Sequence, residues 1–407
     1  MKHVVKIIMM LCLVCITSIG CGGDNSSPTN DNTADTRTIA DMRGREVEIP
    51  TDISRVVTLD DGFVAGIMTI LGEADTIVGL GSQCPQKAYT YSFESVEGEG
   101  YTYAEGVNPV RYLNPRFADL PLLTTYGQAT NYETLAGLEP DLVTLRVGSC
   151  YADDNSGDPE VLNRKIKTIE SLGIPLVILE APVFDNPDLS DVTEEIRVVG
   201  QIFDEEKKAL EIAYYLEDII EMIAERTAGI AEVDKPEVLM FGLSPTARKS
   251  GGAGNIWGTD TIESFFLEEI VHARNAYDGV GSFSITLSAE QVLAENPDVI
   301  ILPTSNGYHP PSELYTAPYY QNLQELDAVK NRRVVSLPWT PCNCAKRIEY
   351  PIEVMIMAKA SYPELFEDIK INEWVLGFYR DVYGVNEETA RGLRTAQWLD
   401  WTVEEDW

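Results

Sequence analysis

The chain has 407 residues, of which 65 are acidic and 31 basic, so its formal net charge at pH 7 is -34. This excess leaves no basic surface to neutralise phosphates, which excludes nucleic acid as an expected partner. Beyond the first twenty residues only His272 and His309 remain, so a Ser-His-Asp catalytic arrangement or a histidine-rich site for free zinc or manganese has little to draw on.

The first twenty residues have the features of an export signal. Lys2 and Lys6 form a positive start, and Val4–Ile19 is an apolar run that is short for a membrane span. Small residues precede Cys21, and the segment resembles a bacterial or archaeal lipoprotein signal in which this cysteine carries the lipid. We therefore expect removal of residues 1–20 and a lipid-anchored protein outside the cytoplasm, in the periplasm or on the outer cell surface.

Residues 21–37, which follow the predicted cleavage point, consist mainly of Gly, Asn, Asp, Ser, Thr and Pro. A segment with almost no apolar side chains cannot form a core, so we predict a flexible tether. No later hydrophobic run reaches membrane-spanning length, and the rest of the chain is expected to fold as a soluble body.

An N-terminal α/β lobe is predicted over residues 38–190. The predicted elements are a hairpin Thr38–Pro50 turning at Gly44, strands Arg55–Leu59, Thr76–Leu80 and Ile174–Leu179, helices Phe63–Leu71 and Val161–Leu172, and a helix that runs from Asn131 into a strand ending at Arg146. Strands that alternate with helices are typical of a parallel sheet.

Residues 85–126 interrupt this alternation. They contain many Gly, Pro and Asn residues without a clear period, together with Tyr89, Tyr91, Phe93, Tyr101, Tyr103, Tyr112, Phe117 and Tyr126. An irregular insertion of this length is usually functional or disordered, and the aromatic content argues against disorder. A lid over a ligand and a surface flap both remain open, and the position at the carboxyl end of a strand favours the lid.

A connecting helical segment is predicted over residues 191–233. Its main helix, Asp204–Gly229, has Asp204 as the expected N-cap and Gly229 as the expected C-cap. The apolar stripe is Ala209, Ala213, Leu216, Ile220 and Ile223, at spacings of three and four residues. The pattern predicts a long amphipathic connector.

A second α/β lobe is predicted over residues 234–407, because the pattern of the first recurs. Glu133 precedes Asp141 by eight residues, both on a helix that passes through Pro-Asp into a strand, and Glu290 precedes Asp298 in the same way. The predicted elements are strands Pro236–Phe241 and Arg333–Leu337, helix Thr259–His272, the helix-to-strand segment Ser288–Leu302, and helices from Pro351 onward. Gly251–Gly254 lacks the Lys and Ser/Thr of a phosphate-binding loop and is interpreted as a turn.

These segments resemble the substrate-binding proteins of ATP-driven importers for metal chelates, the family that carries ferric siderophores, haem and corrinoids such as cobalamin. The residues that carry the resemblance are Asp41-Met-Arg-Gly-Arg before Arg55-Val-Val, the paired Glu-to-Pro-Asp segments, Leu326-Asp-Ala-Val-Lys before Arg333-Val-Val, and Tyr362-Pro-Glu-Leu-Phe. The resemblance implies two parallel-sheet α/β lobes joined by a single long rigid helix. It also implies a ligand cleft between the lobes, and a permease and an ATPase as partners.

The same resemblance assigns candidate site residues. One exposed glutamate on each lobe docks onto the permease in this family, and the matching positions are Glu133 and Glu290. Ligand contacts are expected from the loops after the strands, namely Asp60, Asp61, Ser82, Gln83, Arg146, Arg248, Trp257, Tyr308 and Trp339. Arginines would pair with ligand carboxylates and aromatic rings would pack on a flat macrocycle.

The cysteines of the body add one structural prediction. Cys84 and Cys150 each end a segment that begins as a strand, and an exported protein permits a disulfide between them. Cys342 and Cys344 are expected to be structural or free thiols, with soft-metal binding alongside His309 as the minority alternative.

We therefore expect a monomeric binding protein that has no resident cofactor or metal and performs no catalysis, its ligand being the chelate. A surface sensor or adhesion lipoprotein on the same fold is the alternative. An exported enzyme is less favoured, because Gly279–Ser282 and Gly81-Ser82 do not form a Gly-x-Ser-x-Gly nucleophile elbow.

Overall fold

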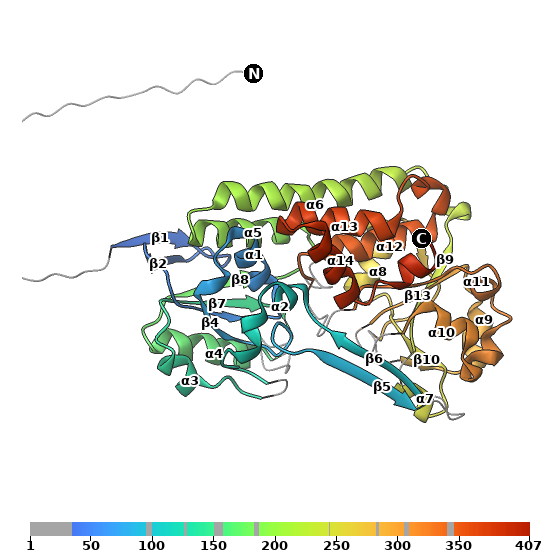
Figure 1. The fold of residues 1–407 in the computed structure, drawn as a ribbon, viewed down its shortest axis with the longest axis horizontal. Helices are drawn as coiled ribbons and strands as arrows, with labels where there is room; N and C mark the ends of the chain where they lie inside the picture. The colour runs from blue at the N-terminus through green and yellow to red at the C-terminus, as the bar shows by residue number, and fades with distance from the viewer. Residues whose placement is uncertain are drawn as a thin grey trace, which may run out of the picture. The chain divides into compact units, whose positions relative to one another are not determined.

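Two larger sheets organise the chain, and each belongs to one lobe (Figure 1). The computed structural model describes residues 35–94, 100–125, 128–149, 158–182, 187–243, 245–281, 285–304, 309–339 and 346–407. The predicted signal segment and Cys21 lie outside these ranges. Within them, no helix combines the length and the apolar character needed to cross a membrane.

The N-terminal lobe contains a parallel sheet of four strands in the order β4-β3-β7-β8. The strands are β3 (Val56–Leu59), β4 (Ile77–Leu80), β7 (Leu142–Val147) and β8 (Leu176–Glu180). The helices of this part of the chain are α1 (Phe63–Leu71), α2 (Pro109–Leu113), α3 (Tyr132–Gly137), α4 (Pro159–Ser171) and α5 (Ser190–Ile202). The prediction of α1 from Phe63 to Leu71 is confirmed to the residue.

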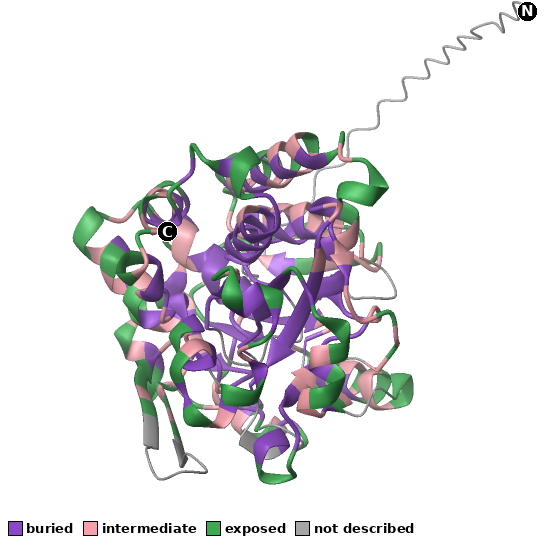
Figure 2. Ribbon diagram, turned by 90° about the vertical axis from the view of Figure 1, so that its right-hand side faces the viewer, coloured by how far each residue is buried: buried purple, intermediate pink, exposed green. Residues whose placement is uncertain are grey.

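Helices cover both faces of this sheet, which explains why its strands are apolar throughout rather than alternating. Val56 and Leu142 face a cluster that includes residues of α1 and α5. Val57 and Val143, one position further on, face the opposite cluster with Leu135 of α3 and residues of α4. In Figure 2 the C-terminal lobe faces the viewer, with buried strands in the middle of the molecule and helices around them that carry exposed residues on the outside.

The sheet of the C-terminal lobe has the predicted parallel centre, to which two antiparallel edge strands are added. β9 (Glu237–Gly242), β13 (Val299–Leu302) and β14 (Val334–Ser336) are parallel, and β11 (Arg274–Asn275) pairs with the start of β9. β10 (Gly254–Ile256) and β12 (Ile285–Leu287) are antiparallel additions at the edge. These strands have only three residues each, too few to show a periodic pattern.

Helices and turns complete the C-terminal lobe. They are α7 (Pro245–Lys249), α8 (Ile262–Phe265) continued by a π-helical turn Phe266–Ile270, α9 (Ala289–Glu295), α10 (Pro311–Thr316), α11 (Asp327–Lys330), α12 (Tyr350–Ser361), α13 (Ile371–Tyr383), α14 (Glu387–Ala396) and α15 (Trp401–Glu404). α13 contacts α1 and α14 contacts α2, so the C-terminal helices also touch the first lobe. The domain boundaries near residues 190 and 233 stay predictions.

The paired Pro-Asp segments have the same structural role in both lobes. A carboxylate oxygen of Asp141 accepts hydrogen bonds from the backbone N–H groups of Ser54 and Arg55, at 2.9 and 2.8 Å, just before β3. Asp298 accepts from the N–H of Glu237 at 2.9 Å, at the start of β9. Each aspartate lies just before its own strand, β7 or β13, and binds the backbone at the start of the neighbouring strand, β3 or β9. This shared role accounts for the internal repeat.

The long connector α6 (Glu206–Thr227) packs along α5 and α1 and then along α12, so it contacts both lobes. Both predicted caps are wrong. Asp204 has φ +57 and closes the end of α5, where the N–H of Glu205 reaches the carbonyl of Gly200 at 2.8 Å. Glu205 is therefore the N-cap, and Ala228, not Gly229, is the C-cap.

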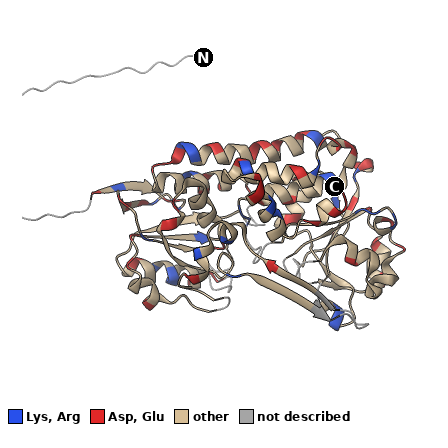
Figure 3. Cartoon of the chain, viewed as in Figure 1, with Lys and Arg blue, Asp and Glu red and all other residues tan. Residues whose placement is uncertain are grey.

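The apolar stripe of α6 is confirmed except at one position, because Ile219 is buried and Ile220 only partly so. A Cβ on Gly200 would lie 2.5 Å from the Cβ of Ala209, so the α5–α6 crossing requires glycine at this point. Charged residues are distributed along α6 (Figure 3). A single hydrophobic cluster runs from α1 and α5 through α6 to α12 and α13, which makes this side of the molecule continuous between the lobes.

The insertion at 85–126 is not irregular. Its described part contains an antiparallel hairpin of β5 (Tyr89–Glu94) and β6 (Gly100–Gly106), followed by α2 and a 3-10 turn at Pro115–Asp119. A register shift between Tyr89 and Tyr91 breaks the alternation, which hid the strands from sequence analysis.

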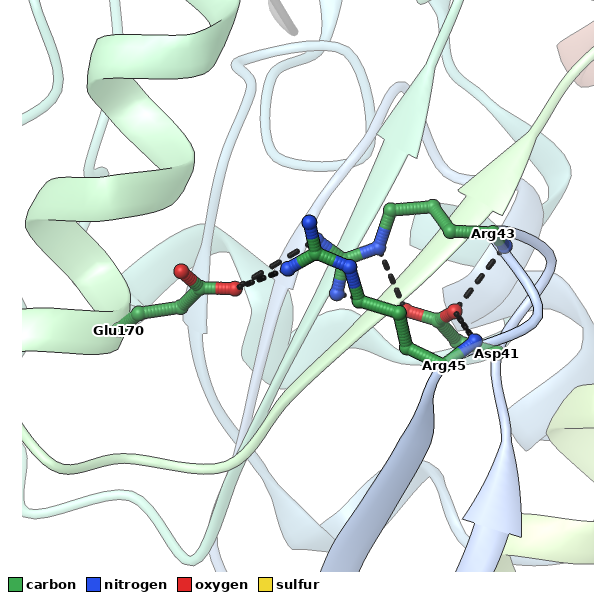
Figure 4. Close-up of polar contacts among 4 residues, drawn as sticks. All are labelled: Asp41, Arg43, Arg45 and Glu170. Atoms are coloured by element: carbon green, nitrogen blue, oxygen red, sulfur yellow. Dashed lines mark hydrogen bonds and ion pairs between the residues drawn. The ribbon is translucent and has the colours of Figure 1, made fainter.

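A small hairpin of β1 (Thr36–Ala40) and β2 (Glu46–Pro50) opens the described chain, with Gly44 at φ +70 in its turn as predicted. The buried carboxylate of Asp41 closes this turn (Figure 4). It accepts from the N–H groups of Arg43 and Arg45 at 3.0 and 3.1 Å, and from the guanidinium of Arg43 at 2.7 Å. Both arginines also reach Glu170 at the end of α4, at 3.5 and 3.4 Å. The turn is thus fastened to the first lobe.

We expect the substitution Asp41→Ala to lower the free energy of unfolding by about 2–3 kcal/mol, because it leaves two backbone N–H groups and a guanidinium without their acceptor. Urea denaturation measures the change. Glu170→Ala is the matched control, and because its carboxylate is partly exposed we expect a loss below about 1 kcal/mol. Equal losses in the two variants would contradict the assignment of Asp41 as the main fastening of the turn.

Candidate functional site

The strand order of the first lobe marks one position for a ligand. From β3 the chain moves outward to β4 on one side and later to β7 on the other, so the direction of winding reverses between β3 and β7. In open α/β sheets, ligands bind outside the carboxyl ends of the strands at such a reversal. Asp60 and Asp61 follow β3, and Arg146 lies near the end of β7. The structure therefore brings these predicted residues to one place.

Arg146 is completely buried, and its charge is matched by Glu195 of α5. The two groups form a bidentate pair, with Nε to Oε1 at 2.6 Å and Nη2 to Oε2 at 2.7 Å. The remaining Nη1 donates to the carbonyl oxygen of Lys346 at 2.7 Å, and the guanidinium lies 3.9 Å from the ring centre of Phe63. Arg146 thus links the two halves of the chain, and its predicted contact with ligand stays a prediction.

Asp60 has one bonded and one unbonded carboxylate oxygen. Oδ2 accepts from the N–H groups of Gly62 and Val64, at 3.0 and 2.8 Å, and so starts α1. Oδ1 is buried and has no hydrogen-bond partner among the described residues. Burial raises the pKa of Asp60, although the N–H of Val64 and the charge of Arg146 act to lower it. A buried acceptor without a donor marks a place where a ligand or water group would be stabilised.

The segment that begins at Lys346 returns from the second lobe to this position. Arg347 donates through Nε to the backbone oxygen of Asp61 at 2.9 Å. Lys346 forms two ion pairs of 2.7 Å, with Glu263 and Glu353. Burial acts to lower the pKa of Lys346, but the two carboxylates outweigh it and raise the pKa. Charged residues therefore hold the two lobes together beside the predicted ligand position.

Aromatic side chains from β5, β6 and the segments after β14 and α14 pack against one another. Trp339 follows β14 and is completely buried, with ring centres of Tyr89, Tyr91 and Trp398 at 5.2, 6.2 and 4.7 Å. Tyr103 lies 6.1 Å from Trp398. Burial raises the pKa of Tyr89 to about 12, so its hydroxyl stays protonated at neutral pH. We name these residues the aromatic group.

A buried polar cluster continues the site in the second lobe. Glu313 of α10 accepts from Arg248 of α7 at 3.4 Å and lies 2.5 Å from Nδ1 of His309. The hydroxyl of Tyr103 donates to the same carboxylate at 3.3 Å. The guanidinium of Arg248 lies 5.9 Å from the ring centre of Tyr319, within the range of a cation-π contact. The predicted Arg248 is thus oriented by a carboxylate that sequence analysis did not identify.

Protonation of His309 should destabilise the protein in acid. Burial lowers the pKa of His309 below 6.5, although Glu313 acts to raise it. The stability that neutral His309 contributes is therefore present above pH 6.5 and is lost as the pH falls through the lowered value. We measure the free energy of unfolding by urea denaturation at pH 7.5 and at pH 5.0. The decrease between the two pH values should be smaller in His309→Asn than in the unchanged protein. An identical decrease in both proteins would contradict the role of neutral His309 in stability.

The other predicted ligand residues are placed as follows. Ser82 is buried and accepts from the N–H of Cys84 at 3.0 Å, whereas Gln83 accepts from exposed Lys87 at 2.8 Å. Trp257 is buried in the main hydrophobic cluster against Gly242, where a Cβ would lie 2.7 Å from its ring. Tyr308 lies outside the described residues. Contact of any of these with ligand stays a prediction.

Cys84 is disulfide-bonded. Its predicted partner Cys150 lies outside the described residues, as do Cys342 and Cys344, so the pairing stays a prediction. Among the described residues, no group of three or more His, Cys, Asp and Glu side chains has the arrangement of a metal site.

The two predicted docking glutamates occupy equivalent, exposed positions. Glu133 lies in the first turn of α3, after the N-cap Asn131, and Glu290 lies in the first turn of α9, after the N-cap Ser288. A hydrogen bond from its own backbone N–H and one from Ser288 lower the pKa of Glu290. Both carboxylates therefore lie at the surface, in the first turns of two short helices at equivalent positions of the internal repeat.

Sequence analysis missed Glu195, Glu313, Arg347 and Trp398. Glu195 and Glu313 are acids on helices in a chain rich in such acids, so no local signal separates them from exposed ones. Trp398 and Arg347 come from C-terminal segments that only the fold brings to the site. Tyr89, Tyr91 and Tyr103 were named only as members of an aromatic insertion.

The fold and the site define a binding protein with two α/β lobes and a polar and aromatic region beside their contact. Residues 62–340 match the family described as Periplasmic binding protein, and the chain belongs to that family. It is a solute-binding protein of the ABC-transporter type, a class of extracytoplasmic substrate-binding proteins that are not enzymes.

Known relatives agree with this assignment. The chain is 24% identical over 378 residues to YvrC of Bacillus subtilis, an uncharacterized ABC transporter substrate-binding lipoprotein, covering 90% of this chain and 100% of that protein. It is 22% identical over 379 residues to the molybdate-binding protein MolA of Haemophilus influenzae, covering 88% and 94%. The structure of a periplasmic solute binding protein from Veillonella parvula has the same fold, with a TM-score of 0.66 and 20% identity over 92% of this chain and 100% of that one.

Proposed function

We propose that the protein captures a metal chelate, namely an iron chelate, haem or a corrinoid, and delivers it to the permease of an ABC importer. The observation that carries this proposal is the aromatic group beside buried Arg248. Flat aromatic surfaces suit macrocycles and catechol rings, and an arginine suits the carboxylates that such chelates carry. The buried, unbonded oxygen of Asp60 adds an acceptor on the opposite lobe.

A bare oxyanion is the second candidate. MolA is named for molybdate, and its molybdate-bound structure has a TM-score of 0.60 with this chain. Arg248, 7% exposed, would supply positive charge for an oxyanion in the same way as for a carboxylate. The aromatic group favours the chelate, because an oxyanion has no flat surface to pack against it.

Delivery depends on partners that the same proposal names. Exposed Glu133 and Glu290 would dock onto arginines of the permease and set the register of the complex. A lipid on Cys21 would hold the protein at the membrane. If the chain were a sensor or adhesion protein on this fold, neither glutamate would affect transport.

Elemental analysis separates the candidates. The purified protein is incubated in turn with haemin, cyanocobalamin, a ferric siderophore and molybdate, then desalted, and bound metal is measured by plasma mass spectrometry. We expect about one iron or cobalt per chain from one of the chelates, reduced at least tenfold in Arg248→Met but not in the exposed control Arg164→Met. Retention of molybdenum alone would replace the chelate by the oxyanion, and retention of no metal would overturn the proposal.

A further inference from the structure

The inserted hairpin reaches across to the second lobe. β5 and β6 leave the first lobe after β4 and return to it before α2, yet their described residues contact segments that follow β13 and β14 (Figure 1). We name residues 89–94 and 100–106 the strap. Its tyrosines pack against the same hydrophobic cluster to which the connector α6 contributes.

Backbone groups fix the base of the strap to the end of α14. The indole N–H of Trp398 donates to the carbonyl of Ala104 at 3.0 Å, and the N–H of Val107 donates to the carbonyl of Ala396 at 3.2 Å. A Cβ on Gly106 would lie 2.5 Å from the ring of Trp398. The ring therefore lies directly against the backbone of the strap, and only glycine permits this approach.

A side-chain contact fixes β6 further along. The hydroxyl of Tyr103 donates to the carboxylate of Glu313, the same group that holds Arg248 and His309. The rings of Tyr103 and His309 lie 6.4 Å apart, edge to face. The position of the strap is thus coupled to the arginine that the proposed function assigns to the ligand.

The strap also covers an aromatic residue of the second lobe. Trp339 has no exposed surface, and Tyr89 and Tyr91 of β5 supply two of its ring contacts. Both tyrosines are themselves only partly buried. The covering layer is therefore one side chain thick, and its removal would expose Trp339.

We propose that the strap is a second, reversible tie between the lobes, which must leave Trp339 and Trp398 before the face beneath it is accessible. The tie follows from the contacts above and holds for any ligand. Its consequence for ligand entry rests on the proposed function, since the covered face carries Trp339 and Trp398 of the aromatic group, and Glu313 joins the strap to Arg248.

The reversibility follows from the kind of contact. Single hydrogen bonds and ring contacts each shift a local opening equilibrium by about five- to tenfold, and the bond from Tyr103 to the carboxylate of Glu313 belongs at the upper end. Tyr89, Tyr91 and Tyr103 of the strap are only partly buried and pack against the edge of the main hydrophobic cluster, whereas α6 places fully buried side chains such as Leu216 and Ile223 within it. The strap should therefore open far more often than the rest of the fold.

Hydrogen exchange of the full chain, read by mass spectrometry, tests the tie with Gly106→Ala. The added methyl group should displace Trp398 and speed exchange at least tenfold in peptides that contain Val107 and Trp339. The Trp339 peptide belongs to the second lobe, so its response reports the tie itself. Gly137→Ala is the matched control, because a Cβ there meets no atom within 4 Å, and it should change neither peptide.

Peptides from β3 check that the fold is intact and should exchange at the unchanged rate in both variants. If Gly106→Ala speeds exchange everywhere, Tyr103→Phe decides, with an expected increase of about tenfold at Trp339 that the exposed control Tyr214→Phe lacks. An unchanged rate at Trp339 in both Gly106→Ala and Tyr103→Phe would overturn the proposal. If none of haemin, cyanocobalamin and the ferric siderophore binds, only the proposed chelate function falls, because the exchange result is obtained without ligand.

Discussion

Replacing Arg146 by methionine is expected to lower the free energy of unfolding by about 3–5 kcal/mol at pH 8. Methionine has a similar length and keeps the contact with Phe63, but it leaves the carboxylate of Glu195 buried without a cation. It also removes the hydrogen bond to the carbonyl of Lys346. Loss of one partner of a buried pair is costly because the remaining charge cannot be solvated.

The loss should depend on pH. Burial raises the pKa of Glu195 from 4.5 to about 7, and Arg146 is the largest influence that lowers it, so the pKa rises further in the variant. The pKa of Glu195 is higher in the folded state than in the unfolded state. Its contribution to stability is therefore complete below pH 4.5 and is lost as the pH rises through the folded-state pKa. The difference between Arg146→Met and the unchanged protein should therefore be smaller at pH 5 than at pH 8.

Urea denaturation at the two pH values measures this effect. Arg164→Met is the matched control, since Arg164 is exposed and its ion pair within the described chain is with exposed Glu160, and we expect a change below about 0.5 kcal/mol. An equal loss at pH 5 and pH 8, or a loss in Arg146→Met no larger than in the control, would show that the Arg146–Glu195 pair does not hold the fold at the contact between lobes.

The double substitution Glu133→Ala and Glu290→Ala is expected to reduce uptake of the bound chelate by at least tenfold without changing its affinity. Both carboxylates are exposed and lie at equivalent helix starts. Charges at the edge of an interface affect how fast two proteins associate and in which register. Their removal should therefore not alter the ligand site inside the binding protein. Each single variant should lose less than the pair.

Uptake in cells whose importer depends on this chain, together with calorimetric affinity for the same chelate, measures both quantities. The matched control is Glu160→Ala with Glu295→Ala, which removes one exposed carboxylate from each lobe at other positions. Unchanged uptake in the Glu133 and Glu290 variant would contradict the docking assignment. A fall in affinity would instead place one of these residues at the ligand.

Sequence analysis predicted the elements whose signals are local. Asp60-Asp61-Gly62 before Phe63 predicted the start of α1, and the repeated Pro-Asp segments predicted the helix-to-strand passages of both lobes. Caps were less predictable, because Asp204 takes the left-handed conformation that ends α5 and so cannot begin α6. A capping residue type alone does not say which of two adjacent helices it serves.

The candidate site depended on contacts that sequence patterns do not carry. Tyr103 and Glu313 are 210 positions apart, and Arg146 and Lys346 are 200 apart. Asp60 and Trp339 follow β3 and β14, as expected for loops after strands, since the fold class fixes where strand ends lie. Arg146 lies within β7 and Arg248 on α7 instead of in such loops. Arg146 and Arg248 already have protein partners, Glu195 and Glu313. These pairs could not be predicted from the sequence, because only the packing of the helices buries the two carboxylates.

The most direct test of the central claim is a fluorescence titration of the compact unit Asp35–Trp407 with cobalamin, cobinamide, haem and ferric siderophores, corrected for ligand absorbance. A chelate held beside Trp339 and Trp398 should quench tryptophan emission saturably at sub-micromolar concentration, and much less in a variant with both residues changed to phenylalanine. Absence of saturable quenching with every chelate would contradict a chelate site at the aromatic group.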